Sequence, residues 1–196
     1  MKCVNVTATI SLEKKINLKK IKKSPYCVRA TLKCDHNDNL KKFNNVTLKR
    51  PGTTQTFLIY RSGKVVIVGC KSENEVQDAC HWISDLLCIT SIPLPTIHNI
   101  VFSGSLEHEI NLSTLYEHLR KYSTYHTYYE PEISPALVCE TSHEEQGRKG
   151  KMLLFRTGKF IITGLTSTIG SQNILHEIKS QLSIIYSSSV NPLIIY

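Results

Sequence analysis

The sequence predicts an α+β fold built from two copies of one β-rich unit. Three observations predict it. The hairpin-like stretch 57–69 recurs as 152–164, at an offset of 95 positions. A pattern with helical spacing follows each copy of the hairpin, and a strand with a short amphipathic segment precedes each one. The order within each unit is therefore a strand, a short helix, several strands and a longer helix.

The repeated hairpins have matching turns. Two runs of apolar, β-branched or aromatic residues flank Arg61–Lys64 in the first copy and Arg156–Lys159 in the second. The glycine in each turn can adopt the positive φ that a tight turn needs. We expect the closing glycines, Gly69 and Gly164, to end the second strand of each hairpin.

The helices that follow begin at polar residues. Ser72 precedes Glu75 by three positions, a capping pattern, and predicts a helix over 73–88. In the second copy, helical spacing follows the polar pair at 167–168 and the breaker Gly170. The apolar residues of the two predicted helices are Val76, Ala79, Cys80, Ile83, Leu86 and Leu87, and Ile174, Leu175, Ile178, Leu182 and Ile185.

The two units also begin alike, with predicted strands at 5–10 and 99–104, each followed by an amphipathic segment, 16–21 or 110–115. Prolines in the linker 91–96 stop the first unit. We therefore place one repeat at 1–95 and the other at 96–196, with a loosely ordered tail from residue 187.

Charge is unevenly divided between the repeats. Residues 1–95 contain 16 lysines and arginines against 7 acidic residues, whereas residues 96–196 contain 8 against 9. The net charge of +8 thus comes from the first repeat and indicates a polyanionic partner. Charge alone leaves DNA, RNA and anionic lipid open.

Other classes of function have little support. No stretch approaches the roughly 18 apolar residues of a membrane span, and the N-terminus lacks a signal-peptide pattern, so we expect an intracellular protein without membrane association. The seven cysteines lack regular spacing and indicate reduced thiols. Cys34-Asp35-His36 and Cys80-His81 have no repeated metal-ligand spacing, and we expect no enzyme activity, metal or cofactor.

Several motifs resemble those of the TATA-box-binding protein family. They are Lys-Lys-Phe43, Thr-Leu-Lys-Arg50, Leu-Ile-Tyr-Arg-Ser-Gly-Lys64, Gly-Cys-Lys-Ser-Glu73 and Tyr-Glu-Pro-Glu132. The resemblance covers about residues 4–186 and is that of a divergent relative. It leaves open whether the protein is cellular or viral, and so whether it acts in a nucleus or in a cytoplasmic viral factory.

The resemblance implies a saddle, in which two pseudo-symmetric repeats form one curved antiparallel sheet of about ten strands, with four helices on its convex face. It also implies a transcription initiation factor that binds the minor groove of AT-rich promoter double-stranded DNA and bends it with aromatic wedges. Such a factor recruits a transcription factor IIB-like protein and RNA polymerase.

The wedge positions of the family are filled unequally. The first repeat offers Phe43 and Tyr60, whereas the second offers Phe155 but has Ser134 at the partner position. An aromatic residue in a strand is ordinarily a core residue; the family positions favour the DNA-facing interpretation here. We therefore expect the first repeat to anchor DNA and the second to hold it loosely.

The resemblance assigns the remaining DNA contacts by position. Asn5 and Asn99 match paired asparagines that donate to base acceptors, while Glu140 and Thr166 replace basic family residues. The other expected DNA-facing residues are Thr7, Val66, Val68, Val101, Ile161 and Thr163, and the expected phosphate contacts are Lys49, Arg50, Lys64, Lys71 and Lys159.

The acidic loop Glu130, Pro131 and Glu132 implies contact with the transcription factor IIB-like partner. The insertion 143–150 is expected to lengthen a hairpin. A second hypothesis stays open, since Ser134, Glu140 and Thr166 favour a protein-interaction scaffold on the same fold with weak or partner-dependent DNA binding. We prefer DNA binding.

Overall fold

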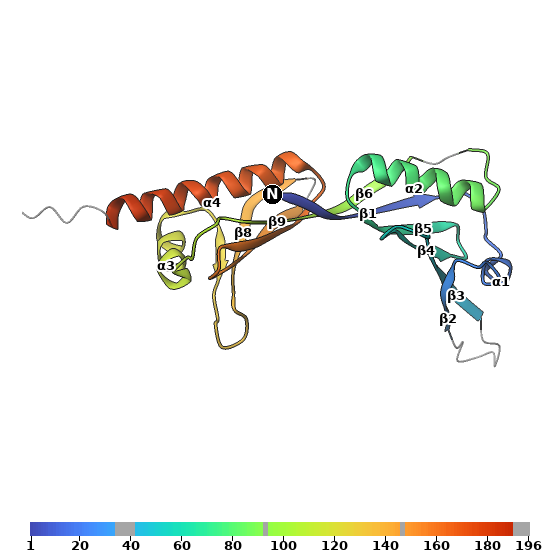
Figure 1. The fold of residues 1–196 in the computed structure, drawn as a ribbon, viewed down its shortest axis with the longest axis horizontal. Coiled ribbons are helices and arrows are strands. Elements are labelled where there is room, and N and C mark those ends of the chain that lie inside the picture. The colour runs from blue at the N-terminus through green and yellow to red at the C-terminus, as the bar shows by residue number, and fades with distance from the viewer. Residues whose placement is uncertain (34–41, 92–93, 146–147, 190–196) are drawn as a thin grey trace, which may run out of the picture. The chain divides into compact units, whose positions relative to one another are not determined.

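The computed structural model describes residues 1–33, 42–91, 94–145 and 148–189. Ten strands form one antiparallel sheet in the order β2-β3-β4-β5-β1-β6-β10-β9-β8-β7, and four helices accompany it (Figure 1). These numbers confirm the predicted α+β class with ten strands and four helices. The elements are β1 Lys2–Ser11, α1 Leu18–Ile21, β2 Cys27–Lys33, β3 Lys42–Lys49, β4 Thr56–Tyr60, β5 Lys64–Cys70, α2 Glu73–Leu86, β6 Thr96–Ser105, α3 Leu112–Tyr122, β7 His126–Tyr128, β8 Ala136–Glu145, β9 Arg148–Phe155, β10 Lys159–Leu165 and α4 Thr168–Ser189.

The chain divides into two compact units. The first unit is Val4–Asn99, and the second is Ile100–Tyr196 together with Met1–Cys3. The start of β1 therefore belongs with the second unit, and the start of β6 with the first. A repeat boundary between residues 95 and 96 stays a prediction.

The first unit's core lies between its strands and α2. Alternate residues of β4 and β5 point toward the helix, and Phe57, Ile59 and Ile67 are fully buried there. Ile83 of α2 is buried as well, and the Trp82 ring packs on Phe57 with centroids 4.8 Å apart. Apolar residues at every second position of the strands and an apolar stripe along α2 thus bury one face of the sheet against this helix.

The second unit repeats this arrangement with different side chains. Met152, Leu154 and Ile162 of β9 and β10 are fully buried, and Ile174 and Ile178 of α4 cover them. The repeated hydrophobic pattern therefore produces the same layers in both copies.

The turn glycines behave as predicted. Gly63 has φ +96° and Gly158 has φ +76°. A Cβ atom at either position would lie 2.3 Å from a backbone oxygen, that of Lys14 or of His108. The two turns are therefore equivalent in conformation and in what they contact.

Some sequence-based boundaries were wrong by a few residues. Gly69 and Gly164 do not end their strands, because β5 and β10 continue for one more residue, with positive φ at each glycine. Ser72 caps α2 as predicted, its Oγ accepting from the Glu75 amide at 3.1 Å, but the helix ends at Leu86.

The last helix was also misjudged. Gly170 does not delay it, since α4 begins at Thr168 and the Gly170 amide donates to Ser167 Oγ at 3.0 Å. The helix continues to Ser189, into the predicted loose tail; residues 190–196 lie outside the described residues. A helix start thus tolerates glycine where a side chain caps its amide.

The insertion does lengthen a hairpin. β8 and β9 pair as far as Glu145 with Arg148, with an irregularity between Glu140 and Glu144. Residues 146–147 at its tip are outside the described residues. No helix in the described part of the chain is long and apolar enough to cross a bilayer.

Candidate nucleic-acid interface

In each unit, the sheet face opposite α2 or α4 carries partly exposed side chains; we call it the open face. Alternation along the strands places the buried residues toward the helix and the intervening ones on this face. The first unit's open-face residues are Asn5, Thr7, Thr9, Asn45, Thr47, Lys49, Thr56, Leu58, Tyr60, Lys64, Val66 and Val68.

An apolar strip runs across the centre of the first open face. Leu58 pairs with Val66, and the neighbouring Thr56 pairs with Val68. Directly opposed residues of adjacent strands have Cβ atoms about 5 Å apart, so these side chains are contiguous. Tyr60 lies at the next open-face position of β4 and is also partly exposed.

Asn5 is held in a defined orientation. Its Oδ1 accepts from the Gly69 amide at 2.8 Å, and its Nδ2 donates to Thr7 Oγ1 at 3.2 Å. The amide's donor side is therefore turned toward the open face. Asn99 is partly exposed and lies in the same compact unit as Asn5, at the start of β6.

Phe43 is placed by its backbone alone. It lies in β3 opposite Leu32, two residues before Asn45, which pairs with Tyr60. Its side chain lies outside the described residues.

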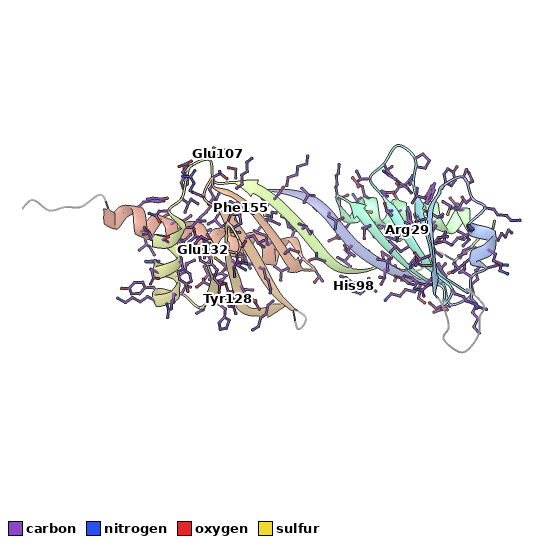
Figure 2. All side chains as sticks on the ribbon, turned by 90° about the horizontal axis from the view of Figure 1, so that it is seen from below. Arg29, His98, Glu107, Tyr128, Glu132 and Phe155 are labelled. Atoms are coloured by element: carbon purple, nitrogen blue, oxygen red, sulfur yellow. The ribbon has the colours of Figure 1, made fainter. Side chains whose placement is uncertain are left out.

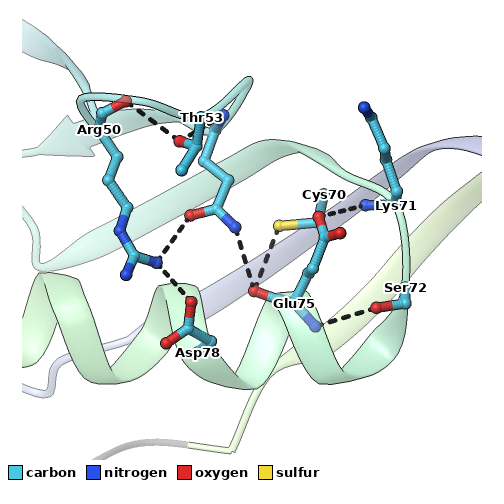
Figure 3. A network of polar contacts seen from close by, with 8 residues as sticks. Arg50, Thr53, Cys70, Lys71, Ser72, Glu75 and Asp78 are labelled. Carbon is cyan, nitrogen blue, oxygen red and sulfur yellow. Dashed lines mark hydrogen bonds and ion pairs between the residues drawn. The ribbon is translucent and has the colours of Figure 1, made fainter.

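The predicted phosphate contacts of the first unit separate into two groups. Lys49 and Lys64 are exposed on open-face positions, and Lys71 is exposed just after β5. Arg50 instead turns toward α2, where its Nη1 donates to Asp78 Oδ2 at 2.6 Å. Figure 3 shows this network.

Further contacts hold Arg50 on the helix side. The same Nη1 donates to Gln55 Oε1 at 3.1 Å, and the guanidinium lies 5.8 Å from the centre of the Trp82 ring. The structure therefore does not bring Arg50 together with Lys49 and Lys64.

The second unit has a corresponding apolar strip. Ile161 pairs with Leu153 on one side and with Ser103 on the other, and Thr163 pairs with Lys151. Val101 and Phe155 are partly exposed, and Lys159 is exposed. Figure 2 shows Phe155 among the strands on the side away from α4.

A pocket lies beside Phe155. Its volume is about 710 Å³. Phe155, Ile161 and Pro135 are apolar residues of its lining, and Lys159 also lines it. The open face here is therefore hollowed next to the aromatic side chain.

Strand register supports the equivalence of Ser134 and Phe43. Asn45 pairs with Tyr60, and Ala136 pairs with Phe155, so residues 43 and 134 each precede the equivalent position by two. Ser134 Oγ accepts from the Ala136 amide at 3.3 Å. A serine whose hydroxyl accepts from a backbone amide two residues further on therefore occupies the position of an aromatic residue in the other unit.

Charge differs between equivalent positions too. Lys49 and Glu140 occupy the same place in their units, opposite Thr56 and Lys151. Glu140 is mostly buried and pairs with Lys151, with Nζ and Oε2 3.0 Å apart. At this position the second open face therefore lacks the positive charge that Lys49 gives the first. Thr166 is uncharged and partly buried after β10.

The predicted partner loop is accessible. Glu130, Pro131 and Glu132 are all exposed, and the Glu130 carbonyl accepts from the amides of Ile133 and Ser134 at 2.9 Å each. The neighbouring Tyr129 ring lies 6.2 Å from that of Tyr116 on α3. The loop is thus a hydrogen-bonded turn fixed beside α3.

Sequence reasoning missed several open-face residues. Leu58 and Leu153 belong to the repeated hairpins, and Lys151 directly precedes the second one. Alternation from Tyr60 and Phe155 was the signal that identifies all three. Tyr128, 58% exposed and opposite Val138, and Ile133, 80% exposed beside the acidic loop, had no comparable signal. His98 was missed as well; its Nε2 lies 2.7 Å from Thr9 Oγ1.

The cysteine and histidine pairs have structural positions. Cys80 is buried against the sheet, whereas His81 is exposed on α2. Cys34, Asp35 and His36 lie outside the described residues.

The chain matches a family model described as "Transcription factor TFIID (or TATA-binding protein, TBP)" over residues 1–88 and 94–185. TATA-box-binding protein 2 of Haloferax volcanii is 37% identical over 130 residues, which is 64% of this chain and 66% of that protein, just under two thirds of its length. TATA-box-binding protein F of Halobacterium salinarum is 33% identical over 74% of this chain and 77% of its own. The solved structure of Methanococcus jannaschii TBP aligns with a TM-score of 0.70 and 26% identity, over 93% of this chain and 97% of that one.

Proposed function

The chain belongs to the TATA-binding protein family, and from this premise we propose that it is a transcription initiation factor that binds the minor groove of AT-rich promoter DNA. One observation carries the proposal. Both units keep an apolar strip on an open face, Leu58 with Val66 and Leu153 with Ile161.

The chemistry of the strip suits the minor groove. A·T pairs present only acceptors there, whereas a G·C pair adds the guanine amino group. Apolar and β-branched side chains leave that donor without a partner, so they favour A·T pairs. Asn5 supplies a donor, because its Oδ1 is held by Gly69 while its Nδ2 can exchange Thr7 for a base acceptor.

We attribute bending of the DNA to the aromatic residues. Phe43, Tyr60 and Phe155 are proposed to unstack base steps, at an energetic cost that the added contact area offsets. The second unit has Ser134 where the first has Phe43, so its side of the site is expected to bend less.

The distribution of charge also favours stronger DNA binding by the first unit. Lys49, Lys64 and Lys71 are exposed in the first unit, whereas Lys151 of the second is paired with Glu140. Each neutralised phosphate releases counterions and strengthens binding in a salt-dependent way. We propose that the first unit anchors the DNA. Lys159 and the donor side of Asn99 assist, while Arg50 supports Asp78 rather than phosphate.

The acidic loop is the proposed contact with a transcription factor IIB-like protein, and through it with RNA polymerase. Glu130 and Glu132 present two exposed carboxylates, and Ile133 presents an exposed apolar side chain next to them. A basic surface with an apolar depression is the complementary partner. Normal capture of that factor by a Glu130→Arg, Glu132→Arg variant would refute this assignment.

The function is tested by selecting bound duplexes from a random pool, with bending measured in parallel, and with the IIB-like factor present or absent. We expect AT-rich sites and a bend without the factor. Enrichment only in its presence would indicate a partner-dependent binder.

A protein-interaction scaffold is the second candidate function. Ser134 and the Glu140–Lys151 ion pair favour it, because both weaken the second open face as a DNA surface. Selection that yields no enriched sequence in either arm, with capture of the IIB-like factor retained, would establish the scaffold and reject the promoter factor.

A further inference from the structure

A pocket of about 590 Å³ lies in the first unit between α1 and the end of α2. Its apolar lining consists of the largely buried Ile16 and Ile21 on the α1 side and the partly exposed Leu86 and Leu87 on the α2 side. None of its lining residues belongs to the open face.

Lysines surround this α1–α2 pocket. Lys14, Lys15, Lys20 and Lys23 are among its twelve lining residues, all four are exposed, and none of the twelve is acidic. Glu13 and Asp85 are the exposed acidic residues adjacent in sequence. Residues 13–23 contain six lysines and one glutamate, so positive charge dominates the rim.

The duplication provides an internal comparison. Lys14 and His108 are equivalent. In each unit, a Cβ atom placed on the turn glycine would lie 2.3 Å from the carbonyl oxygen of this residue. Residues 107–117 contain three glutamates and no lysine or arginine. The basic rim is therefore specific to the first unit and is not required by the fold.

The second unit places part of its own chain beside the residue equivalent to Lys14. α2 ends at Leu86, whereas α4 continues past the corresponding residue, Gln181, to Ser189 (Figure 1). In this extension the Tyr186 ring packs edge-on against His108, with centroids 5.8 Å apart. One side chain of the extra helical turns thus contacts the residue equivalent to Lys14, which lines the pocket of the first unit.

We propose that the α1–α2 pocket binds an acidic amphipathic helix of a partner protein. The apolar side of that helix fills the pocket, and its carboxylates face the four lysines. The site is separate from the open faces, and the inference does not depend on DNA binding.

A nucleic acid fits the pocket less well. Phosphates would pair with the lysines but leave the surface of Ile16, Ile21, Leu86 and Leu87 uncovered. An amphipathic helix satisfies both the charged rim and the apolar floor, so the combined chemistry favours a peptide.

The test is fluorescence anisotropy with a labelled peptide of about four helical turns, having leucine at helical spacing and glutamate elsewhere. The probe is compared with a peptide carrying glutamine at every glutamate position. We expect the glutamate peptide to bind more tightly, and its affinity to fall as salt is raised. A photoreactive leucine in the peptide should cross-link to residues 14–25 or 86–88.

Matched variants locate the site. The double variant Lys20→Glu, Lys23→Glu should weaken peptide binding about tenfold or more. The control is Lys19→Glu, Lys179→Glu, which makes the same change in net charge outside the pocket. It should change the affinity for the peptide less than about twofold. Circular dichroism confirms that both fold. Equal loss in the two variants, equal binding of the glutamine peptide, or cross-links elsewhere would overturn the proposal. A DNA duplex that displaces the peptide and cross-links at the pocket would overturn it in favour of nucleic acid.

Discussion

Single residues determine how the two units differ. Ser134 and Phe43 occupy the same register position, and Glu140 and Lys49 do likewise, so side-chain changes on one backbone pattern alter both shape and charge. Alignment of the repeats predicts these differences. It does not predict that Arg50 turns to Asp78, because that contact joins residues 28 positions apart through the packing of α2.

The wedge asymmetry predicts unequal mutational effects. Phe43→Ala should weaken binding to an AT-rich duplex by about tenfold or more and reduce its bend, because it removes an aromatic contact worth about 1–3 kcal/mol. Ser134→Ala should change neither, since the serine has no aromatic surface to lose. Anisotropy and fluorescence energy transfer between the duplex ends measure the two quantities, and equal losses would refute the asymmetry.

A buried hydroxyl gives a second residue-scale prediction. Tyr125 is buried, and its hydroxyl donates to Glu177 Oε2 at 2.9 Å. Tyr125→Phe should lower the free energy of unfolding by about 1–2 kcal/mol, because Glu177 loses a charge-assisted partner. Tyr128→Phe, at an exposed tyrosine, should change it by less than about 0.5 kcal/mol. Urea unfolding measures both, and similar values would contradict the assigned role.

At the scale of elements, the hairpins were the most predictable part. Buried and exposed residues alternate along their strands as far as Val68 and Thr163, and their turn glycines have the positive φ that the sequence indicated. Helix ends were less predictable, because Gly170 is tolerated inside α4 through a cap from Ser167, and because α4 continues past Tyr186, whose ring packs on His108.

The turn glycines allow a matched test of element stability. Gly63 and Gly52 both have positive φ, but a Cβ at Gly63 would meet the Lys14 carbonyl at 2.3 Å, whereas nothing lies within 4 Å of one at Gly52. Gly63→Ala should cost about 3 kcal/mol or more, and Gly52→Ala about 1 kcal/mol. Thermal and urea unfolding compare the two. Equal costs would show that the turn does not pack against the segment before α1.

For the whole molecule, buried thiols predict loss of stability in alkali. Burial raises the pKa of Cys70 to about 12, with nearby Glu75 adding to the shift, that of Cys80 to about 11 and that of Cys139 to about 12, from an ordinary 9.0. Above pH 9 the unfolded chain releases these protons while the folded chain keeps them. The unfolded state then binds fewer protons, so the free energy of unfolding falls as pH rises.

Urea unfolding under reducing conditions should therefore give nearly constant stability from pH 7 to 8 and a decline between about pH 9 and 11. Cys139→Ala should make that decline shallower, because one linked group is removed. A decline of unchanged steepness in this variant would contradict the linkage to the buried thiols.

Minor-groove recognition is the central claim at this scale, and inosine substitution measures it most directly. Binding is compared among an AT-rich duplex, the same duplex with inosine·cytosine pairs, and one with guanine·cytosine pairs. Inosine lacks the minor-groove amino group but changes the major-groove pattern. We predict similar affinity for the first two duplexes and a loss of about tenfold or more for the third. Loss of binding to the inosine duplex equal to that for guanine would contradict minor-groove recognition by the open faces.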